Sequence, residues 1–374
     1  DLQLAVEKII EEELWGLKKT PNTSLLDRAY VVLMDPNNGA VLTMAGKRIV
    51  KNPETGQLEM QDDALGTITT TYNVGSAVKG ATVLTGFKTG VIKPGTRIND
   101  TGIKIKDTPL KKSYSYLGTL NDVDALKLSS NVYMFHTAIR IGKGNYQYEQ
   151  PLSLAPNTVE IIRNSFASFG LGSRTGIDLP NESSGLKGPS RLPGHIMDLV
   201  IGQYDTYSPM QLAQYISTIA NGGKRMKPHI VKEIREPIDN NTDEIGPVFQ
   251  EIKPTVLNTI DAEPAWMDRV QLGFKKVFQE PGGTAFRRFT GVSYSPAGKT
   301  GTAEAFYDGP ERAKFGKEPP PVMNLSLVTY APSTNPEVAM AVIVPWAYQG
   351  TTDNGANFLI GRRVMDTYFA MKNN

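Results

Sequence analysis

The chain has 374 residues and a formal net charge of +2, from 40 Lys and Arg against 38 Asp and Glu. This balance lacks the basic excess of nucleic-acid-binding proteins, so we expect no nucleic-acid partner. The absence of cysteine excludes disulfides, thiolate nucleophiles and thiolate metal sites. The three histidines, His136, His195 and His229, lie far apart in the sequence, and we expect neither a metal nor a cofactor.

The length predicts roughly two to three domains, or one domain that carries a large insertion. The longest apolar run near the end, Val338 to Val344, is too short for a membrane helix of about 20 residues. The opening residues, Asp1, Leu2 and Gln3, resemble the middle of a protein and show no signal peptide. We therefore expect that a preceding segment is missing.

The first quarter of the chain predicts a helix followed by a β-hairpin. Apolar residues recur at helical spacing from Leu2 to Leu14, opposite a run of glutamates. Two β-type runs, Ala29 to Met34 and Ala40 to Ala45, flank an Asn-Gly turn.

From about residue 74 to 290 the pattern is mostly helical and is broken by Pro- and Gly-rich loops. Three β-type runs then follow, at Ala297 to Phe306, Met323 to Ala331 and Val338 to Pro345, before a last amphipathic helix. Strands at both ends predict one sheet closed by distant segments, with a helical domain inserted. The segment 305–322, rich in Pro, Gly and charge, predicts a mobile connection between two strands.

Ser76 and Lys79 form the first candidate catalytic pair. Gly75 and Ser76 open an apolar helical segment that runs to Phe87, which leaves the Ser76 hydroxyl at the positive end of the helix dipole. Lys79, three residues later, lies on the same helix face. Its amine could take the hydroxyl proton while Ser76 attacks a carbonyl. Taken alone, the pair is as compatible with a helix-capping serine near a solvated lysine as with a catalytic pair.

This chemistry makes a demand on Lys79. A lysine that acts as a base at neutral pH needs its pKa lowered by about three units. Burial and a second nearby cation can supply that shift. The hypothesis therefore predicts another Lys or Arg close to Lys79 in space.

Two further motifs could complete the site. Ser129 and Asn131 offer a hydroxyl and an amide between two helical patterns, although such a cluster is more often a turn or cap. Lys299, Thr300, Gly301 and Thr302 lie on a β-type run, where Gly301 permits close approach of another backbone. Thr300 and Thr302 alternate to one face of that strand.

Each motif also occurs a second time in the chain. Ser184 and Lys187 repeat the first motif in a polar loop, and Lys88 to Gly90 repeats the third at a helix end. Ser333 to Asn335 repeats the second and predicts a turn. Only Ser76, Ser129 and Lys299, 53 and then 170 residues apart, give a helix start, an interhelical loop and a strand in that order.

This combination resembles the penicillin-binding protein and serine β-lactamase superfamily. The resemblance to class B penicillin-binding proteins, of the Gram-positive elongation type, covers nearly the whole chain. It is carried by further segments: Met34 to Pro36, Gly39 to Ala45, Phe169 to Gly172, Thr175 to Pro180, Gly202 and Gln203, Pro209 to Ala213, and Ala220 to Gly223.

The resemblance implies an α/β (α+β) fold in which an antiparallel sheet is flanked by helices and carries a large all-helical insertion. It implies one transpeptidase domain over residues 1–374. The sheet subdomain would comprise 1–73 and 291–374, and the mainly helical subdomain 74–290. The resemblance further leads us to expect that the membrane anchor and N-terminal pedestal domain usual for the class are missing from this sequence, and that the enzyme would act on the extracytoplasmic face of the membrane.

The resemblance also implies a role for each motif residue. Ser76 would be acylated by a stem peptide ending in D-Ala-D-Ala, with Lys79 as general base. Ser129 would relay a proton to the leaving amine beside Lys299, and Asn131 would hold the substrate amide and Lys79. In this arrangement Lys299 would also be the second cation that lowers the pKa of Lys79.

The substrate would bind beside the strand. The backbone N–H groups of Ser76 and Thr302 would form the oxyanion hole. Thr300 and Thr302 would bind the terminal carboxylate, and the strand from Lys299 through Gly301 would pair with the peptide. Val74 stands where the family often has proline, which removes a rigid turn but no catalytic group.

The function implied is a D,D-transpeptidase that cross-links peptidoglycan and is acylated by β-lactams. A membrane glycosyltransferase and other cell-wall synthesis proteins are the implied partners. The alternatives are a β-lactamase or D,D-carboxypeptidase of the same fold, a β-lactam sensor domain or an inactive scaffold. Asn131 in the middle motif and the long segments that resemble class B penicillin-binding proteins favour the transpeptidase.

Overall fold

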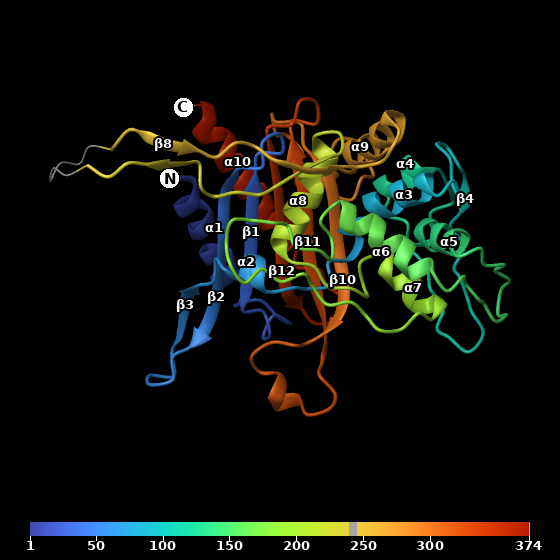
Figure 1. Ribbon diagram of the computed structural model, residues 1–374. Coiled ribbons are helices and arrows are strands. Elements are labelled where there is room, and N and C mark those ends of the chain that lie inside the picture. Colours follow the sequence, from blue (N-terminus) through green and yellow to red (C-terminus); the bar gives the residue numbers. More distant parts are fainter. Residues whose placement is uncertain (239–244, 374) are drawn as a thin grey trace.

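A computed structural model describes residues 1–238 and 245–373. Its centre is a six-stranded antiparallel sheet in the order β10-β11-β12-β1-β2-β3. Segments from both ends of the chain build this sheet, as the sequence predicts (Figure 1). The strands are β1 (Arg28–Met34), β2 (Val41–Lys51), β3 (Leu58–Asp62), β10 (Ala297–Phe306), β11 (Pro321–Ala331) and β12 (Val338–Tyr348).

Helices cover both faces of the sheet and extend beyond its β10 edge, where α3 to α7 gather (Figure 1). The longer helices are α1 (Leu2–Leu17), α3 (Lys79–Lys88), α4 (Asp122–Lys127), α5 (Asn131–Ile141), α6 (Thr158–Ser168), α7 (Pro193–Leu199), α8 (Pro209–Ala220), α9 (Pro264–Gln279) and α10 (Ala356–Asn373). Short helical turns are α2 (Gly66–Thr69), η1 (Gly75–Val78), η2 (Phe286–Arg288) and η3 (Arg312–Phe315). None of the described helices is both long and apolar enough to cross a membrane.

The central strands β1 and β12 are apolar except for Arg28 of β1, because both faces of the sheet are buried. In β1, Tyr30 and Val32 point into the core shared with α3 and α8, whereas Val31 and Leu33 point into the core shared with α1 and α10. All residues of β1 and β12 are buried. Two cores on opposite faces therefore fix the sheet between the helical layers.

Residues 74–290 are mainly helical, but the expected all-helical insertion is wrong, because this region also contains three two-stranded ribbons. They pair β4 (Ile98–Asn99) with β5 (Thr119–Leu120), β6 (Lys224–Met226) with β9 (Val256–Thr259), and β7 (Glu233–Arg235) with β8 (Val248–Glu251). Runs of two to four residues are too short to show a period-2 pattern.

The last strand continues three residues beyond Pro345, where the sequence pattern predicted its end. The pairing register with β11 shifts at this point, and the N–H of Trp346 bonds to the Asn324 side chain at 2.9 Å instead. Proline lacks a backbone donor, so it is tolerated at such a bulge.

The segment 305–322 does connect two strands, as predicted. Both strands run into it, and η3 lies within the connecting loop. Tyr307 in this loop is buried, with its ring 4.9 Å from Trp346 and 5.8 Å from Phe315. The predicted mobility of the segment stays a prediction.

Candidate active site

Ser76 lies in the turn η1, directly before α3. A 3₁₀ turn brings side chains three residues apart above one another, which is the geometry expected to place Ser76 and Lys79 on one face. The preceding Gly75 has φ +59°, and a Cβ there would lie 2.2 Å from the carbonyl oxygen of Thr302. Only glycine therefore lets the serine turn press against β10.

Hydrogen bonds to two other segments also hold the serine turn in place. The backbone N–H groups of Val74 and Gly75 both donate to the carbonyl of Gly202, at 3.2 and 2.9 Å. The Ser326 hydroxyl of β11 donates to the carbonyl of Val74 at 2.6 Å. Proline at position 74 could not make the first of these bonds, so Val74 exchanges a rigid turn for a hydrogen bond.

Lys79 is fully buried and its amine is surrounded by acceptors. Its Nζ donates to Asn131 Oδ1 at 2.6 Å and to the carbonyl oxygen of Ser129 at 2.7 Å, and it lies 3.2 Å from Ser129 Oγ. Asn131 Nδ2 donates to the carbonyl of Lys112, which fixes the amide orientation with its oxygen toward Lys79.

Ser129 lies in the turn between α4 and α5, as predicted, and Asn131 is the first residue of α5. Ser129 adopts a left-handed φ of +58°, and Ser130 caps α5 by accepting from the N–H of Tyr133 at 3.0 Å. The cluster is therefore a helix cap, and the same turn directs Ser129 and Asn131 toward Lys79.

Lys299 is the second cation that the sequence argument required. It is fully buried on β10, and its Nζ donates to Ser129 Oγ at 2.9 Å and to the carbonyl of Thr300 at 3.0 Å. Residues 220 positions apart in the chain thus place two amines on one hydroxyl.

Both amines have lowered pKa values. Burial is the main cause for Lys79, the Lys299 cation is the second, and the Asp100 carboxylate opposes them, leaving the pKa of Lys79 well below its usual value. Burial alone lowers the pKa of Lys299 to about 7. Lys79 therefore has the electrostatic environment of a base.

Thr300 and Thr302 line a cleft of about 990 Å³ together with Ser76, Ser129 and Asn131. The Thr300 hydroxyl is 2.9 Å from that of Thr284. β10 is an edge strand, so the side of it not paired to β11 is open to strand addition.

Gly301 on β10 keeps the strand close to the serine turn. A Cβ at Gly301 would lie 2.2 Å from both the Val74 carbonyl and the Ser326 hydroxyl. The predicted close approach of another backbone to this strand is confirmed.

The second copies of the motifs do not line this cleft. Ser184 and Lys187 are exposed in an irregular loop. Lys88 forms an exposed ion pair with Asp261 at 3.3 Å, and Asn335 lies in the connection between β11 and β12.

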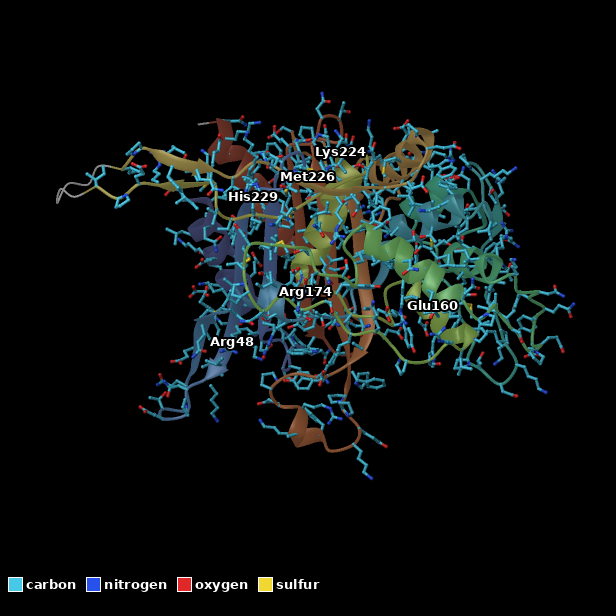
Figure 2. The ribbon with its side chains drawn as sticks, in the orientation of Figure 1. Arg48, Glu160, Arg174, Lys224, Met226 and His229 are labelled. Atoms are coloured by element: carbon cyan, nitrogen blue, oxygen red, sulfur yellow. The ribbon has the colours of Figure 1, made fainter. Side chains whose placement is uncertain are left out.

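The three histidines are dispersed. His229 lies against the β1–β2 turn (Figure 2), where its N–H donates to the Gly39 carbonyl. His136 is in α5 and packs on Tyr146, and His195 is in α7 and stacks on Tyr204. Within residues 1–238 and 245–373, no group of three His, Cys, Asp or Glu is arranged to hold a metal ion.

Comparison with known families identifies the chain. The sequence model of the penicillin-binding protein transpeptidase domain matches residues 29–366. The chain belongs to this family.

Curated relatives agree with that assignment. Penicillin-binding protein 2A of Bacillus subtilis is 51% identical over all of this chain and 51% of its own length. Peptidoglycan D,D-transpeptidase MrdA of Haemophilus influenzae is 25% identical over 98% of this chain and 55% of its own length. The chain thus spans about half the length of these relatives.

The solved structure of penicillin-binding protein 2B from Streptococcus pneumoniae strain R6 superposes with a TM-score of 0.88 and 32% identity, covering 99% of this chain and 58% of that one. The expected family and the expected α/β fold, with its antiparallel sheet flanked by helices, are both confirmed.

The sequence pattern does not mark the groups that hold the three motifs in place. Asp100 and Ser113 are buried and are hydrogen bonded toward Asn131, and Gly202 anchors the serine turn. Asp100 and Ser113 lie in a poorly patterned stretch between helices, and no spacing rule marks them. Gly202 was noted only as part of the family likeness.

Proposed function

We propose that this chain is a serine D,D-transpeptidase domain that forms an acyl-enzyme on Ser76. Its substrates would be peptidoglycan stem peptides ending in D-Ala-D-Ala, and β-lactams would acylate it as mimics of that dipeptide. The observation that carries the proposal is the pair of buried amines, Lys79 and Lys299, on the Ser129 hydroxyl beside the Ser76 cleft. The name of the Haemophilus influenzae relative and the family description support the same activity.

In the acylation step, Lys79 removes the proton from Ser76 Oγ while that oxygen attacks the carbonyl of the penultimate D-Ala. A neutral amine has two N–H bonds and one lone pair. The two N–H bonds of Lys79 are engaged by the carbonyl oxygens of Asn131 and Ser129, which leaves its lone pair for a hydroxyl. This arrangement supports Lys79 as the base and Asn131 as the group that orients it.

The tetrahedral intermediate carries its negative charge on the former carbonyl oxygen. The backbone N–H groups of Ser76 and Thr302 would stabilise that charge, which is consistent with the contact between the Gly75 turn and Thr302. Losing one such donor costs roughly 10²–10³ in rate.

Collapse of the intermediate breaks the peptide bond and forms the Ser76 ester. The terminal D-Ala leaves with a proton delivered through Ser129 from the protonated Lys79. In the second half-reaction, the amine of another stem peptide attacks the ester, a new peptide bond forms, and the proton returns to Ser76.

The terminal carboxylate would bind the hydroxyls of Thr300 and Thr302, close to the Lys299 cation. The donor peptide would lie antiparallel along the free edge of β10, past Gly301, with its backbone groups completing the strand's hydrogen bonds. An edge strand on the cleft supports this mode of binding.

The chain organisation expected from the sequence is part of the proposal. Residues 1–73 and 291–374 would form the sheet subdomain, and 74–290 the mainly helical subdomain, with the cleft between them. The domain would work on the extracytoplasmic face of the cell membrane, beside a glycosyltransferase and other cell-wall synthesis proteins, as a Gram-positive elongation-type enzyme.

Mass spectrometry after addition of benzylpenicillin tests the proposal. We expect one stable adduct on Ser76, which Ser76→Ala abolishes and the matched variant Ser184→Ala retains. Lys88→Ala should also retain it. Rapid turnover of the drug would favour a β-lactamase, and an adduct on another residue would refute the site.

A D-amino-acid exchange assay separates a transpeptidase from a sensor domain or a carboxypeptidase. With a D-Ala-D-Ala donor peptide and a free D-amino acid, a transpeptidase forms the exchanged peptide. A carboxypeptidase forms mainly the hydrolysed peptide, and a sensor forms neither.

A further inference from the structure

Asp100 is a buried carboxylate that the proposed chemistry has not used. It directly follows β4 and is 4% exposed. Its Oδ2 accepts hydrogen bonds from the Ser130 hydroxyl at 2.7 Å and the Ser113 hydroxyl at 2.9 Å. Its Oδ1 is also buried and has no hydrogen-bond partner in residues 1–238 and 245–373. A buried charge with an unpartnered oxygen is costly, so its presence calls for a reason.

The two serines connect Asp100 to the first turn of α5. Ser113 Oγ accepts from the backbone N–H of Asn131 at 2.9 Å. Ser130 Oγ accepts from the N–H of Tyr133 at 3.0 Å. A hydroxyl that accepts from the backbone needs an acceptor for its own proton, and Asp100 provides one for both.

This hydrogen-bond network of Asp100, Ser113 and Ser130 positions the residues that contact Lys79. Asn131 is the first residue of α5, and its side-chain oxygen is 2.6 Å from Lys79 Nζ. Ser129 precedes the cap residue and keeps a left-handed φ of +58°. Movement of the cap would therefore move two of the groups that Lys79 contacts.

Asp100 also acts on Lys79 through its charge. Two charged groups bear on the Lys79 amine: the Lys299 cation from β10 lowers its pKa, and the Asp100 carboxylate from the loop after β4 raises it. The element α5 contributes the uncharged amide of Asn131. The titratable groups influenced by Asp100, besides Lys79, are Tyr114 and His136.

We infer that Asp100 is a positioning residue for the acylation step: through Ser113 and Ser130 it fixes the Ser129–Asn131 turn, and its negative charge offsets that of Lys299 at the Lys79 amine. The inference rests on the proposed function, since it assigns Asp100 a role in the reactivity of Ser76. Asp100 touches neither substrate nor reacting atoms and acts through other residues.

The pH profile of acylation separates the charge of Asp100 from its hydrogen bonds. In Asp100→Asn, the amide oxygen can still accept from both serines, while the charge is lost. The measured quantity is the second-order rate constant for benzylpenicillin acylation, whose acidic limb is the pH range in which it rises as Lys79 loses its proton. We expect this limb to move to lower pH by roughly one unit. A merely structural role would leave the limb where it is.

Ser113→Ala provides the complementary test. It removes the link to the Asn131 N–H but keeps the carboxylate, so the plateau rate constant should fall at least tenfold, while the limb stays in place. This variant decides the positioning role by itself if Asp100→Asn fails to fold. A plateau equal to that of the unmodified chain would refute positioning.

Asp122→Asn is the matched control. Asp122 is also a fully buried carboxylate in the helical region, but it pairs with Arg269 and is not among the groups that shift Lys79. Its replacement should lower thermal stability and leave the limb unmoved. A limb in Asp100→Asn that coincides with the unmodified profile, or moves to higher pH, overturns the inference. An unmodified chain without an adduct on Ser76 would instead overturn the proposed function.

Discussion

Replacing Lys299 with methionine should make Lys79 a poorer base. The variant keeps an unbranched side chain in the buried site but removes the cation that lowers the pKa of Lys79. Both amines reach the Ser129 hydroxyl, at 2.9 and 3.2 Å, so their nitrogens lie at most about 6 Å apart. At an effective dielectric constant of about 20, two unit charges at that separation repel by about 3 kcal/mol, or about two pKa units.

The sign of the effect follows from the protonation state that acts as the base. Removing the repelling cation raises the pKa of Lys79, so less of the amine is neutral at a given pH. The acidic limb of the acylation rate constant should move to higher pH by up to about two units, which is at most about a hundredfold loss of rate on that limb, because Lys299 carries its full charge only below its own pKa of about 7.

Stopped-flow acylation with a fluorescent penicillin, measured from acidic to alkaline pH, gives this limb directly. Lys299→Met also loses a contact to Ser129 and to the substrate carboxylate, so its plateau should fall as well. The position of the limb is therefore the informative quantity. A limb that stays in place would refute the reasoning that the Lys299 charge acts on Lys79.

Three further predictions concern the same region. Gly75→Ala should abolish penicillin labelling and lower the melting temperature in calorimetry, since its Cβ would lie 2.2 Å from the Thr302 carbonyl. The control Gly90→Ala has a similar φ and nothing within 4 Å of its Cβ, so this variant should still be labelled by penicillin. Ser129→Ala should slow acylation by roughly 10²–10⁴ in the stopped-flow assay, because both amines lose their shared hydroxyl, and an unchanged rate would exclude it as the proton relay. Burial lowers the pKa of Lys299 from 10.5 to about 7, so the unfolded chain binds more protons above neutral pH. The free energy of unfolding, measured in urea, should therefore rise from neutral to mildly alkaline pH more steeply than in Lys299→Met. The difference in slope should be at most about 1.4 kcal/mol per pH unit. If the two plots of unfolding free energy against pH run parallel, that pKa is contradicted.

The parts of the fold that follow from local pattern could be predicted from the sequence. The long apolar strands, the opening and closing helices and the helical middle all have a clear period or composition, and each is present. The bulge after Pro345 and the ribbon β4–β5 could not be predicted, because they depend on partners such as Asn324 that are distant in the chain.

The candidate site divides in the same way. Ser76, Ser129 and Lys299 could be chosen among duplicated motifs by their order along the chain, and the demand for a second cation beside Lys79 came from acid–base chemistry alone. Asp100 could not be found, since its role lies in contacts with two serines that no spacing connects. The structure brings these groups together through the packing of α5 against the loop after β4.

A crystal structure of the acyl-enzyme formed with a β-lactam would test most directly whether the hydroxyl at position 76 is the nucleophile of this two-lysine pocket. We expect an ester at Ser76 Oγ, with the acyl oxygen within hydrogen-bond distance of the backbone N–H groups of Ser76 and Thr302. The drug carboxylate should lie on the hydroxyls of Thr300 and Thr302. An ester on another residue, or an acyl oxygen turned away from both N–H groups, would contradict the account.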